Sequence, residues 1–225
     1  MMQEQQNYIK GIFVKELDNR FRCLVNIAGK DTVCYVPASC KLEKLIPLRG
    51  KQVLLLPTQK SDILYSLYAV KLRNSYCLLN LSYANRIVFR QISRKVFNHL
   101  GSRKHVSFEK TISGYKSDLY IQDTNTVIEI KTVISADSTA AFSSIYSERA
   151  VSQLSKLENL LIGGYNVTYL IVGLNPRISK VVVDKNSAIY PKLVKCLDMG
   201  MQLYGVSLHT KNQQFEVFRP ITIDV

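Results

Sequence analysis

Two carboxylates and a lysine in the middle of the chain have the types and spacing to bind a divalent cation. They are Asp118, Glu129 and Lys131, in the segment Tyr115–Ile134. Two close carboxylates repel each other unless a cation lies between them, and oxygen ligands suit Mg²⁺ or Mn²⁺. Such a metal lowers the pKa of a bound water, and a neighbouring lysine can pair with a phosphate oxygen. The predicted chemistry is metal-dependent phosphodiester hydrolysis.

A β-hairpin is predicted to bring these side chains together. Its two strands flank Asp123–Thr126, whose residue types favour turns. If the turn closes so that Gln122 faces Val127, Asp118 lies opposite Lys131. This register is the structural expectation on which the predicted chemistry depends.

The same register places Glu129 opposite Tyr120. Because side chains alternate across a sheet, Asp118, Glu129 and Lys131 then share one face. The other face can be buried, and it carries Leu119, Ile121, Ile128 and Ile130. The spacing D-x10-E-x-K is the pattern of the PD-(D/E)XK nucleases. The competing interpretation is an exposed salt bridge across a hairpin, which has little energetic weight.

Composition and charge narrow the possible partners. The formal net charge is +13 and is spread over both halves of the chain, which favours nucleic acid through counterion release. The five cysteines include no CxxC pair, so we expect reduced thiols rather than a disulfide scaffold or a zinc ribbon. No apolar run approaches the roughly 18 residues needed to cross a bilayer, and the start resembles no secretory signal. We therefore expect a cytoplasmic protein with no membrane partner, and the sequence leaves its oligomeric state open.

Residues 1–80 are predicted to form an all-β domain. Short strands separated by turn signals indicate a small barrel or sandwich, and the five-stranded OB barrel fits this size. An OB barrel commonly binds nucleic acid on an open face. Basic residues that could supply this face are Arg20, Arg22, Lys30, Lys41 and Lys44. A merely solvated barrel surface explains them equally well. The expected strands are Ile9–Glu16, Phe21–Ile27, Thr32–Val36, Gln52–Pro57, Leu64–Leu72 and Tyr76–Leu79.

Residues 81–225 are predicted to form a second, α/β domain. It begins with a helix from about Asn80 to Leu100, on which Arg86, Arg90 and Arg94 form a basic stripe that could follow a phosphate backbone. The later elements expected are a strand near His105–Ile112, the hairpin, a loop at Ser135–Ser144, a helix at Ser147–Leu161, a buried strand at Val167–Gly173, a helix at Ala188–Leu197, and strands at Gln202–Leu208 and Phe215–Arg219. Up to the strand at Val167–Gly173, the order is helix, three strands, helix, strand, which is that of the PD-(D/E)XK core, and the later elements are additions. The predicted fold class is α+β with two domains, an N-terminal OB-like β-barrel and a C-terminal PD-(D/E)XK nuclease-like α/β domain.

Nearly the whole chain resembles the sugar fermentation stimulation protein A family of bacteria and archaea. The segments that carry the resemblance are FVKELDNRFRCLV (13–25), NLSYANRIV (80–88), KSDLYI (116–121), EIKTVI (129–134) and SERAVSQLSKL (147–157). The resemblance implies an OB-fold domain followed by a PD-(D/E)XK domain, nucleic-acid binding, and DNA or RNA nuclease activity.

Residue by residue, the resemblance implies that Asp118 and Glu129 are metal ligands and that Lys131 is the catalytic lysine. The Ile130 carbonyl is expected to complete the metal site, and Glu109 could add a ligand, although it fits a surface carboxylate better. On the second helix, Glu148 and Arg149 match the family's motif, and Arg149 is the expected phosphate contact. Gln153 is also expected at this nucleic-acid interface. Gln153 replaces the family's histidine, and Pro37–Cys40 replaces its P-N-T-G turn.

The leading functional hypothesis is a metal-dependent DNA or RNA nuclease that uses Mg²⁺ or Mn²⁺. The first alternative is a non-catalytic, regulatory DNA-binding protein whose nuclease-like fold is idle. A weaker alternative is a structural or protein-interaction module that uses the barrel.

Overall fold

The computed structural model describes residues 8–38, 41–58, 62–142, 148–212 and 214–225. Its N-terminal part is a closed five-stranded barrel with the strand order β3-β2-β1-β4-β5, closed by a pairing of β3 with β5. A sixth strand, β6, extends the sheet beyond β5. The strands are β1 (Ile9–Glu16), β2 (Arg22–Ile27), β3 (Lys30–Tyr35), β4 (Gln52–Pro57), β5 (Tyr65–Leu72) and β6 (Ser75–Leu78), and a short 3-10 turn spans Leu42–Lys44.

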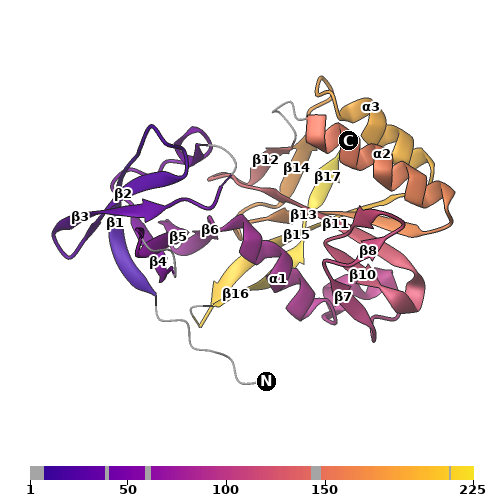
Figure 1. Cartoon of the computed structure of the whole chain (residues 1–225), viewed down its shortest axis with the longest axis horizontal. Coiled ribbons are helices and arrows are strands. Elements are labelled where there is room, and N and C mark those ends of the chain that lie inside the picture. The colour runs from indigo at the N-terminus through magenta and orange to yellow at the C-terminus, as the bar shows by residue number, and fades with distance from the viewer. Residues whose placement is uncertain (1–7, 39–40, 59–61, 143–147, 213) are drawn as a thin grey trace.

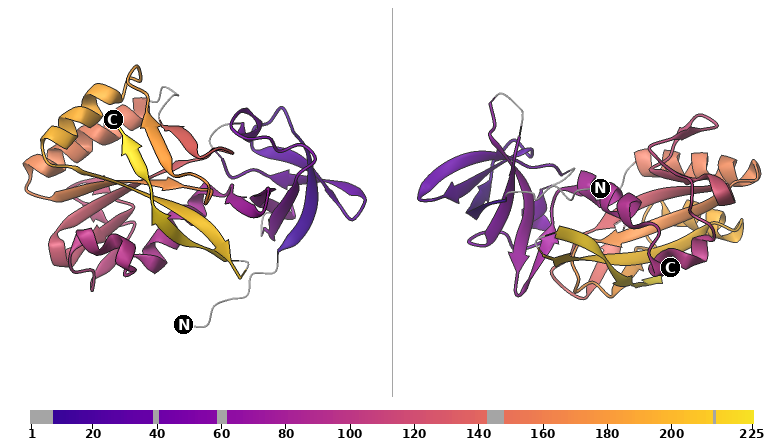
Figure 2. Two further views of the ribbon diagram at one scale, coloured as in Figure 1. Left: turned by 180° about the vertical axis from the view of Figure 1, so that it is seen from behind. Right: turned by 90° about the horizontal axis from the view of Figure 1, so that it is seen from below.

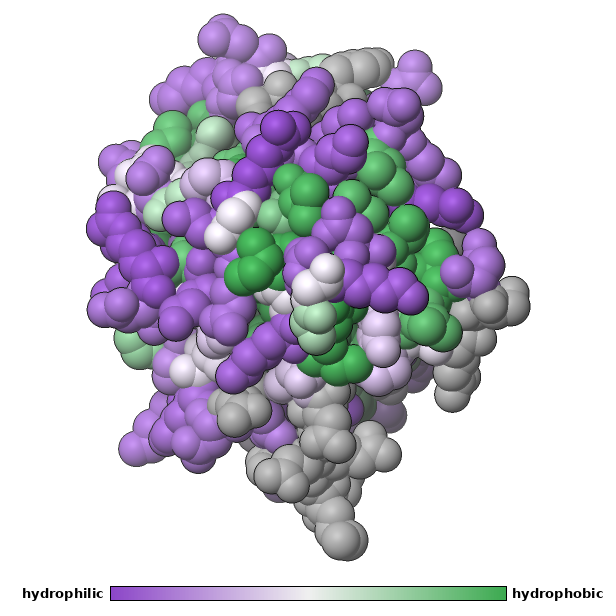
Figure 3. Space-filling view, turned by 90° about the vertical axis from the view of Figure 1, so that its left-hand side faces the viewer, coloured by the Kyte–Doolittle hydropathy of each residue, from purple (hydrophilic) through white to green (hydrophobic). Residues whose placement is uncertain are grey.

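Alternating apolar residues fill the barrel interior, as the strand pattern predicts. Phe13, Val25, Leu55 and Leu67 are all at most 1% exposed. Gly11 permits the close approach of β1 and β2, because a Cβ at this position would lie 2.9 Å from the Asn26 carbonyl oxygen. The end of the molecule formed by the barrel is mainly hydrophilic on its surface, with hydrophobic patches between the polar side chains (Figure 3). The closed five-stranded sheet and its apolar interior confirm the expected OB-like barrel.

The first helix of the second part, α1 (Leu81–Gln91), is shorter than expected. The chain leaves the helix after Gln91 and forms a separate 3-10 segment, Lys95–Leu100, so the prediction of one helix to Leu100 is wrong. Arg94 has extended backbone angles between the two segments. The break allows Phe97, which is completely buried, to pack into the core, and tertiary packing here overrides the helical periodicity.

A six-stranded mixed sheet forms the centre of the second part, with the order β16-β15-β13-β11-β10-β7. Strands β11, β13 and β15 are parallel, and the remaining pairs are antiparallel. Strand β13 is buried on both faces, as its continuous apolar run predicts. The strands are β7 (Val106–Phe108), β10 (Leu119–Ile121), β11 (Thr126–Val133), β13 (Asn166–Gly173), β15 (Gln202–Lys211) and β16 (Gln214–Pro220).

The two faces of this sheet are covered by different layers (Figures 1 and 2). Helix α1 packs on the face that continues into the barrel core. Helices α2 (Glu148–Ile162) and α3 (Tyr190–Asp198) cover the opposite face. A small parallel sheet packs on that same face, and it consists of β12 (Thr139–Phe142), β14 (Lys180–Val183) and β17 (Thr222–Asp224).

The small sheet corrects two sequence expectations. Ser135–Ser144 was expected to be a loop, but it contains β12, and β14 and β17 were not expected at all. These strands are three or four residues long, and each pairs with a segment far away in the sequence, so local patterns do not reveal them. Residues 39–40 and 143–147, including the expected helix start at Ser147, lie outside the described residues.

The barrel and the second part share one hydrophobic cluster. It runs from the barrel strands through α1 to one face of the central sheet. The domain boundary predicted at residue 80 falls between the end of β6 at Leu78 and the start of α1 at Leu81. It stays a prediction. In the described part of the chain, no helix has the length and apolar character needed to cross a membrane.

Candidate active site and nucleic-acid interface

The hairpin β10–β11 forms as predicted, but its register differs from the expected one. Ile121 faces Thr126, so the connecting loop is Gln122–Asn125, one residue earlier than expected. A 3-10 turn occupies this loop, and it ends at Asn125 in a left-handed conformation with a φ of 52°. Asparagine tolerates this conformation, whereas the β-branched Thr126 begins the strand. The predicted register is therefore wrong by one position in the loop.

This displacement of the loop shifts the strand pairing by two residues. Tyr120 faces Val127 rather than Glu129, and continuing the register places Asp118 opposite Glu129 rather than Lys131. Because the shift is even, each side chain stays on its predicted face. The residues of the buried face are at most 6% exposed, and they are Leu119, Ile121, Ile128 and Ile130.

Asp118 directly precedes β10, which begins at Leu119, and lies outside the paired part of the hairpin. Its Oδ2 accepts a hydrogen bond from the Ile130 backbone N–H at 2.7 Å, which satisfies a donor that β10 leaves unpaired. Its Oδ1 accepts a second bond from Asn85 Nδ2 of α1, also at 2.7 Å. The carboxylate is therefore oriented by groups from a helix and from the neighbouring strand.

Glu129 is a buried carboxylate that is held by two donors. It is only 3% exposed, its Oε2 accepts a hydrogen bond from the Tyr115 hydroxyl, and its Oε1 accepts one from Lys131 Nζ at 2.6 Å. The Lys131 ammonium donates a further bond to Gln153 Oε1 of α2 at 2.7 Å. Glu129, Lys131 and Gln153 thus form a connected polar network on the α2 side of the sheet.

The electrostatics of the two carboxylates reflect their burial and proximity. Burial and the Glu129 charge raise the pKa of Asp118 to about 6, against the lowering effects of the Ile130 N–H and Lys131. Burial and the same Glu129 charge raise the pKa of Tyr115 above its usual range, so its hydroxyl stays protonated as a donor. A cation between Asp118 and Glu129 would relieve their mutual repulsion.

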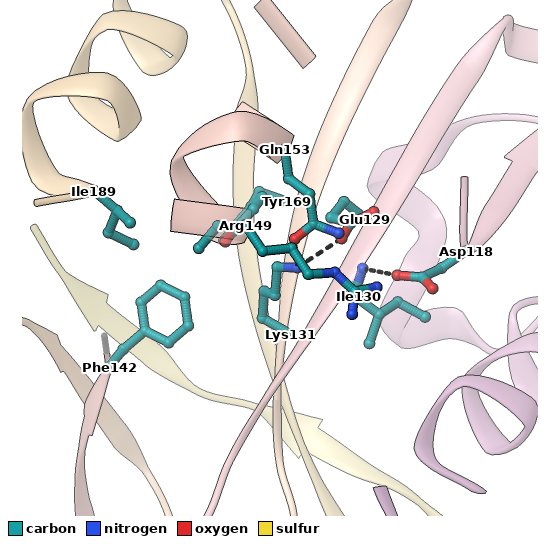
Figure 4. Close-up of a pocket in the computed structure, with 10 residues that line it drawn as sticks. Asp118, Glu129, Ile130, Lys131, Phe142, Arg149, Gln153, Tyr169 and Ile189 are labelled. Carbon is teal, nitrogen blue, oxygen red and sulfur yellow. Dashed lines mark hydrogen bonds and ion pairs between the residues drawn. The ribbon is translucent and has the colours of Figure 1, made fainter. Parts of the chain in front are cut away.

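A pocket of about 340 Å³ opens at these side chains (Figure 4). Asp118, Glu129 and Lys131 line it together with Arg149 and Gln153 of α2. The structure therefore brings these five residues together, and their roles stay a prediction. The remaining lining residues are Ile130, Phe142, Ala150, Tyr169 and Ile189.

The donor set of this pocket fits a hard divalent cation. Each oxygen of Asp118 and Glu129 accepts one hydrogen bond, and a carboxylate has about four lone-pair sites, so acceptor capacity remains. Within the described ranges, no cluster of three or more His, Cys, Asp or Glu side chains could hold a metal. A cation bound by two carboxylates and a carbonyl would retain several waters, as Mg²⁺ usually does.

Two acidic residues of the predicted site, Glu109 and Glu148, lie away from the pocket lining. Glu109 follows β7 with a φ of 52°, and its carboxylate pairs with Lys116 Nζ at the surface. This position agrees with the alternative interpretation of Glu109 as a surface carboxylate. Glu148 is exposed at the start of α2 and does not line the pocket.

Most of the basic residues expected to bind nucleic acid occupy exposed positions. On the barrel, the Arg20 guanidinium lies 4.6 Å from the centroid of the Phe21 ring, and Phe21 stacks on Tyr35 with an interplanar angle of 16°. On α1, both Arg86 and Arg90 are exposed. Arg94, the third residue of the expected stripe, lies beyond α1 and pairs with Glu216 of β16.

Sequence reasoning missed several residues that build the site. Asn85 lies in the segment NLSYANRIV, so the motif itself was a signal for it. Tyr115 precedes Asp118 by three residues, but nothing local indicates its bond to Glu129. Phe142 and Ile189 come from elements that only the tertiary structure brings to the pocket.

Comparison with known proteins places the chain in a family. The model of the sugar fermentation stimulation protein RE domain matches residues 82–214, more than half of the chain. The chain belongs to the sugar fermentation stimulation protein family. A family homologue from Desulforamulus reducens is 24% identical over 90% of this chain and 88% of its own length. Another, from Desulfitobacterium hafniense, is 21% identical over 91% of each chain.

The fold of this family member agrees with a solved structure of the same family. The structure of Pyrococcus furiosus SfsA in complex with Ca²⁺ superposes with a TM-score of 0.82 and covers 100% of both chains at 16% identity. This likeness supports the fold of the whole chain, a barrel followed by a nuclease-like α/β region. The predicted family and fold class are confirmed.

Proposed function

We propose that this family member is a metal-dependent nuclease that hydrolyses phosphodiester bonds of DNA or RNA. The observation that carries the proposal is the convergence of the half-buried Asp118 carboxylate, the buried Glu129 carboxylate and Lys131 in one pocket. An exposed salt bridge, the competing interpretation, would not bury Glu129 or orient it with two donors. A basic protein surface favours a polyanionic substrate.

The residues of the pocket have separate roles in this proposal. Asp118, Glu129 and the Ile130 carbonyl would hold Mg²⁺ or Mn²⁺, which when bound lowers the pKa of a water ligand and stabilises negative charge on the phosphate. Lys131 is held by Glu129 and Gln153, and its remaining N–H is available to a phosphate oxygen or a water. Arg149, exposed on α2 at the pocket, is placed to pair with a phosphate.

The likeness to the Pyrococcus furiosus protein supports a divalent cation in this proposal. That protein was solved as a Ca²⁺ complex. Ca²⁺, Mg²⁺ and Mn²⁺ all prefer oxygen ligands, and carboxylate oxygens line the pocket of the present chain. We assign Mg²⁺ or Mn²⁺ as the working ion, since these ions accompany phosphate chemistry.

The test is release of fragments from single- and double-stranded DNA and RNA with Mg²⁺, Mn²⁺ or EDTA. We expect cleavage that EDTA abolishes and that Lys131→Ala lowers by about 100-fold or more, because a positioned cationic donor is lost. Lys156→Ala, on the exposed face of α2, removes the same charge away from the pocket and should leave cleavage unchanged. If wild type and Lys131→Ala are equally inert on every substrate, the enzyme assignment fails.

The barrel supports a second candidate function, nucleic-acid binding without cleavage. Phe21 and Tyr35 stack on each other, and Arg20 lies over the Phe21 ring, which resembles a platform for bases. This function predicts salt-sensitive binding that persists in Asp118→Asn, with no fragments released by wild type. This candidate would be favoured over the nuclease if Phe21→Ala weakens nucleic-acid binding and the wild type shows no metal-dependent cleavage.

A further inference from the structure

The pocket has one polar end and one apolar end. Asp118 lies at one end in Figure 4, and Phe142 and Ile189 lie at the other. Phe142 and Ile189 are 8% and 2% exposed, and Phe142 packs edge-on against Tyr169 at 6.0 Å between ring centroids. Binding a metal ion and a phosphate requires no apolar wall. The proposed hydrolysis by itself therefore does not account for the apolar end of the pocket.

Cationic side chains lie between the two ends. Lys131 projects from the sheet, and Arg149 extends from α2 between Phe142 and Asp118 in the view of Figure 4. A phosphate paired with Lys131 or Arg149 would have its attached nucleoside within reach of the apolar end. The polar and apolar ends together match the chemistry of one nucleotide, a charged phosphate joined to a flat ring.

The size of the pocket sets a limit on its occupant. A volume of about 340 Å³ lies at the lower end of the range for pockets that enclose small ligands, about 300–1,000 Å³. One nucleotide unit fits this range, whereas a base pair with its two backbones requires more space. A base that enters such a pocket must leave the stack of its neighbours, which costs least when it is unpaired.

We propose that the apolar end of the pocket, formed by Phe142, Ile189 and Tyr169, holds one unstacked nucleobase beside the scissile phosphate. The substrate class is therefore single-stranded or locally unpaired nucleic acid. This inference rests on the proposed nuclease function for its catalytic readout, but it makes a separate statement about binding.

The first experiment changes the substrate and leaves the protein intact. Cleavage rates are measured on one oligonucleotide in single-stranded form, as a blunt duplex, and with an abasic residue on either side of the mapped cleavage position. We expect the single strand to be cut at least about tenfold faster than the duplex, because the duplex must unpair. An abasic residue on one side should lower kcat/KM by about tenfold, through loss of base stacking.

The second experiment links the substrate change to the pocket. Phe142→Leu keeps an aliphatic contact with Tyr169 but removes the ring, and Phe218→Leu, at an exposed position of β16, is the matched control. We expect Phe142→Leu to lower kcat/KM on the intact strand by several-fold and to have little further effect on the abasic strand. This non-additivity is the expected result when both changes remove the same contact.

The outcomes distinguish this inference from the proposed function. Equal cleavage of single strand and duplex, equal cleavage of intact and abasic strands, or fully additive effects with Phe142→Leu would each overturn the base pocket while the nuclease stands. If nothing is cleaved, the nuclease assignment fails, and fluorescence anisotropy with the same oligonucleotides still decides the base pocket. The base pocket is supported if the wild type binds the intact strand more tightly than the abasic strand, and if this preference is lost in Phe142→Leu and kept in Phe218→Leu. Equal binding of the two strands by the wild type overturns the base pocket.

Discussion

The hydrogen bond from Tyr115 to Glu129 provides a sharp test of how the site is built. Tyr115→Phe removes only the hydroxyl and keeps the ring, which is 5% exposed. The Glu129 carboxylate is 3% exposed, so water cannot readily replace the lost donor. Hydrogen bonds to a charged group contribute about 1.5–3 kcal/mol to the free energy of unfolding. We expect a loss of about 2 kcal/mol, and a melting temperature lower by about 4–8 °C for a chain of this length.

A matched control is available in the same hairpin. The Tyr120 hydroxyl donates to the neutral Asn125 Oδ1 at 2.9 Å, and Tyr120 is 9% exposed. Tyr120→Phe should cost about 1 kcal/mol, the usual value for a neutral pair. Urea denaturation in EDTA measures both variants under identical conditions. If Tyr115→Phe costs no more than Tyr120→Phe, the Tyr115 hydroxyl does not stabilise the Glu129 side chain beyond an ordinary neutral hydrogen bond, and the reasoning is refuted.

Three further predictions concern the cation, the phosphate contact and the thiols. Mn²⁺ at 100 times its Kd should stabilise the wild type by about 2.7 kcal/mol, or about 5–10 °C in a thermal melt. Asp118→Asn should abolish this thermal shift. Glu109→Gln should retain the shift, because the Glu109 carboxylate pairs with Lys116. Loss of the shift in Glu109→Gln would instead show that Glu109 is a metal ligand. Arg149→Ala should reduce the slope of log Kobs against log salt by about 1 in a nucleic-acid binding titration, and an unchanged slope would exclude a phosphate contact. Burial raises the pKa of Cys34 to about 11, and it also raises the pKa values of Cys23, Cys77 and Cys196. At pH 8 these thiols therefore form less thiolate than an exposed cysteine does. Iodoacetamide at pH 8 should therefore modify these thiols only after denaturation, as read by mass spectrometry, and rapid modification of the native protein would contradict their burial.

The sequence alone determined the types and approximate positions of the barrel strands, the three helices and the strands of the central sheet. Strands β1 and β4 begin and end at the predicted residues, because their alternating and apolar patterns encode which side chains face the core. The face on which Asp118, Glu129 and Lys131 lie was also predictable, since alternation depends only on parity along the strand. These features are local, and local patterns report them.

The tertiary structure decided the register, the supporting groups and the shape of the pocket. Asn125 closes the hairpin one residue earlier than composition indicated, and the bond from Asn85 to Asp118 joins positions 33 residues apart. Phe142 of β12 and Ile189, which directly precedes α3, meet at one pocket only because both elements pack on the same face of the central sheet. Such contacts depend on how distant segments pack together, and no periodicity in the sequence between them specifies that packing.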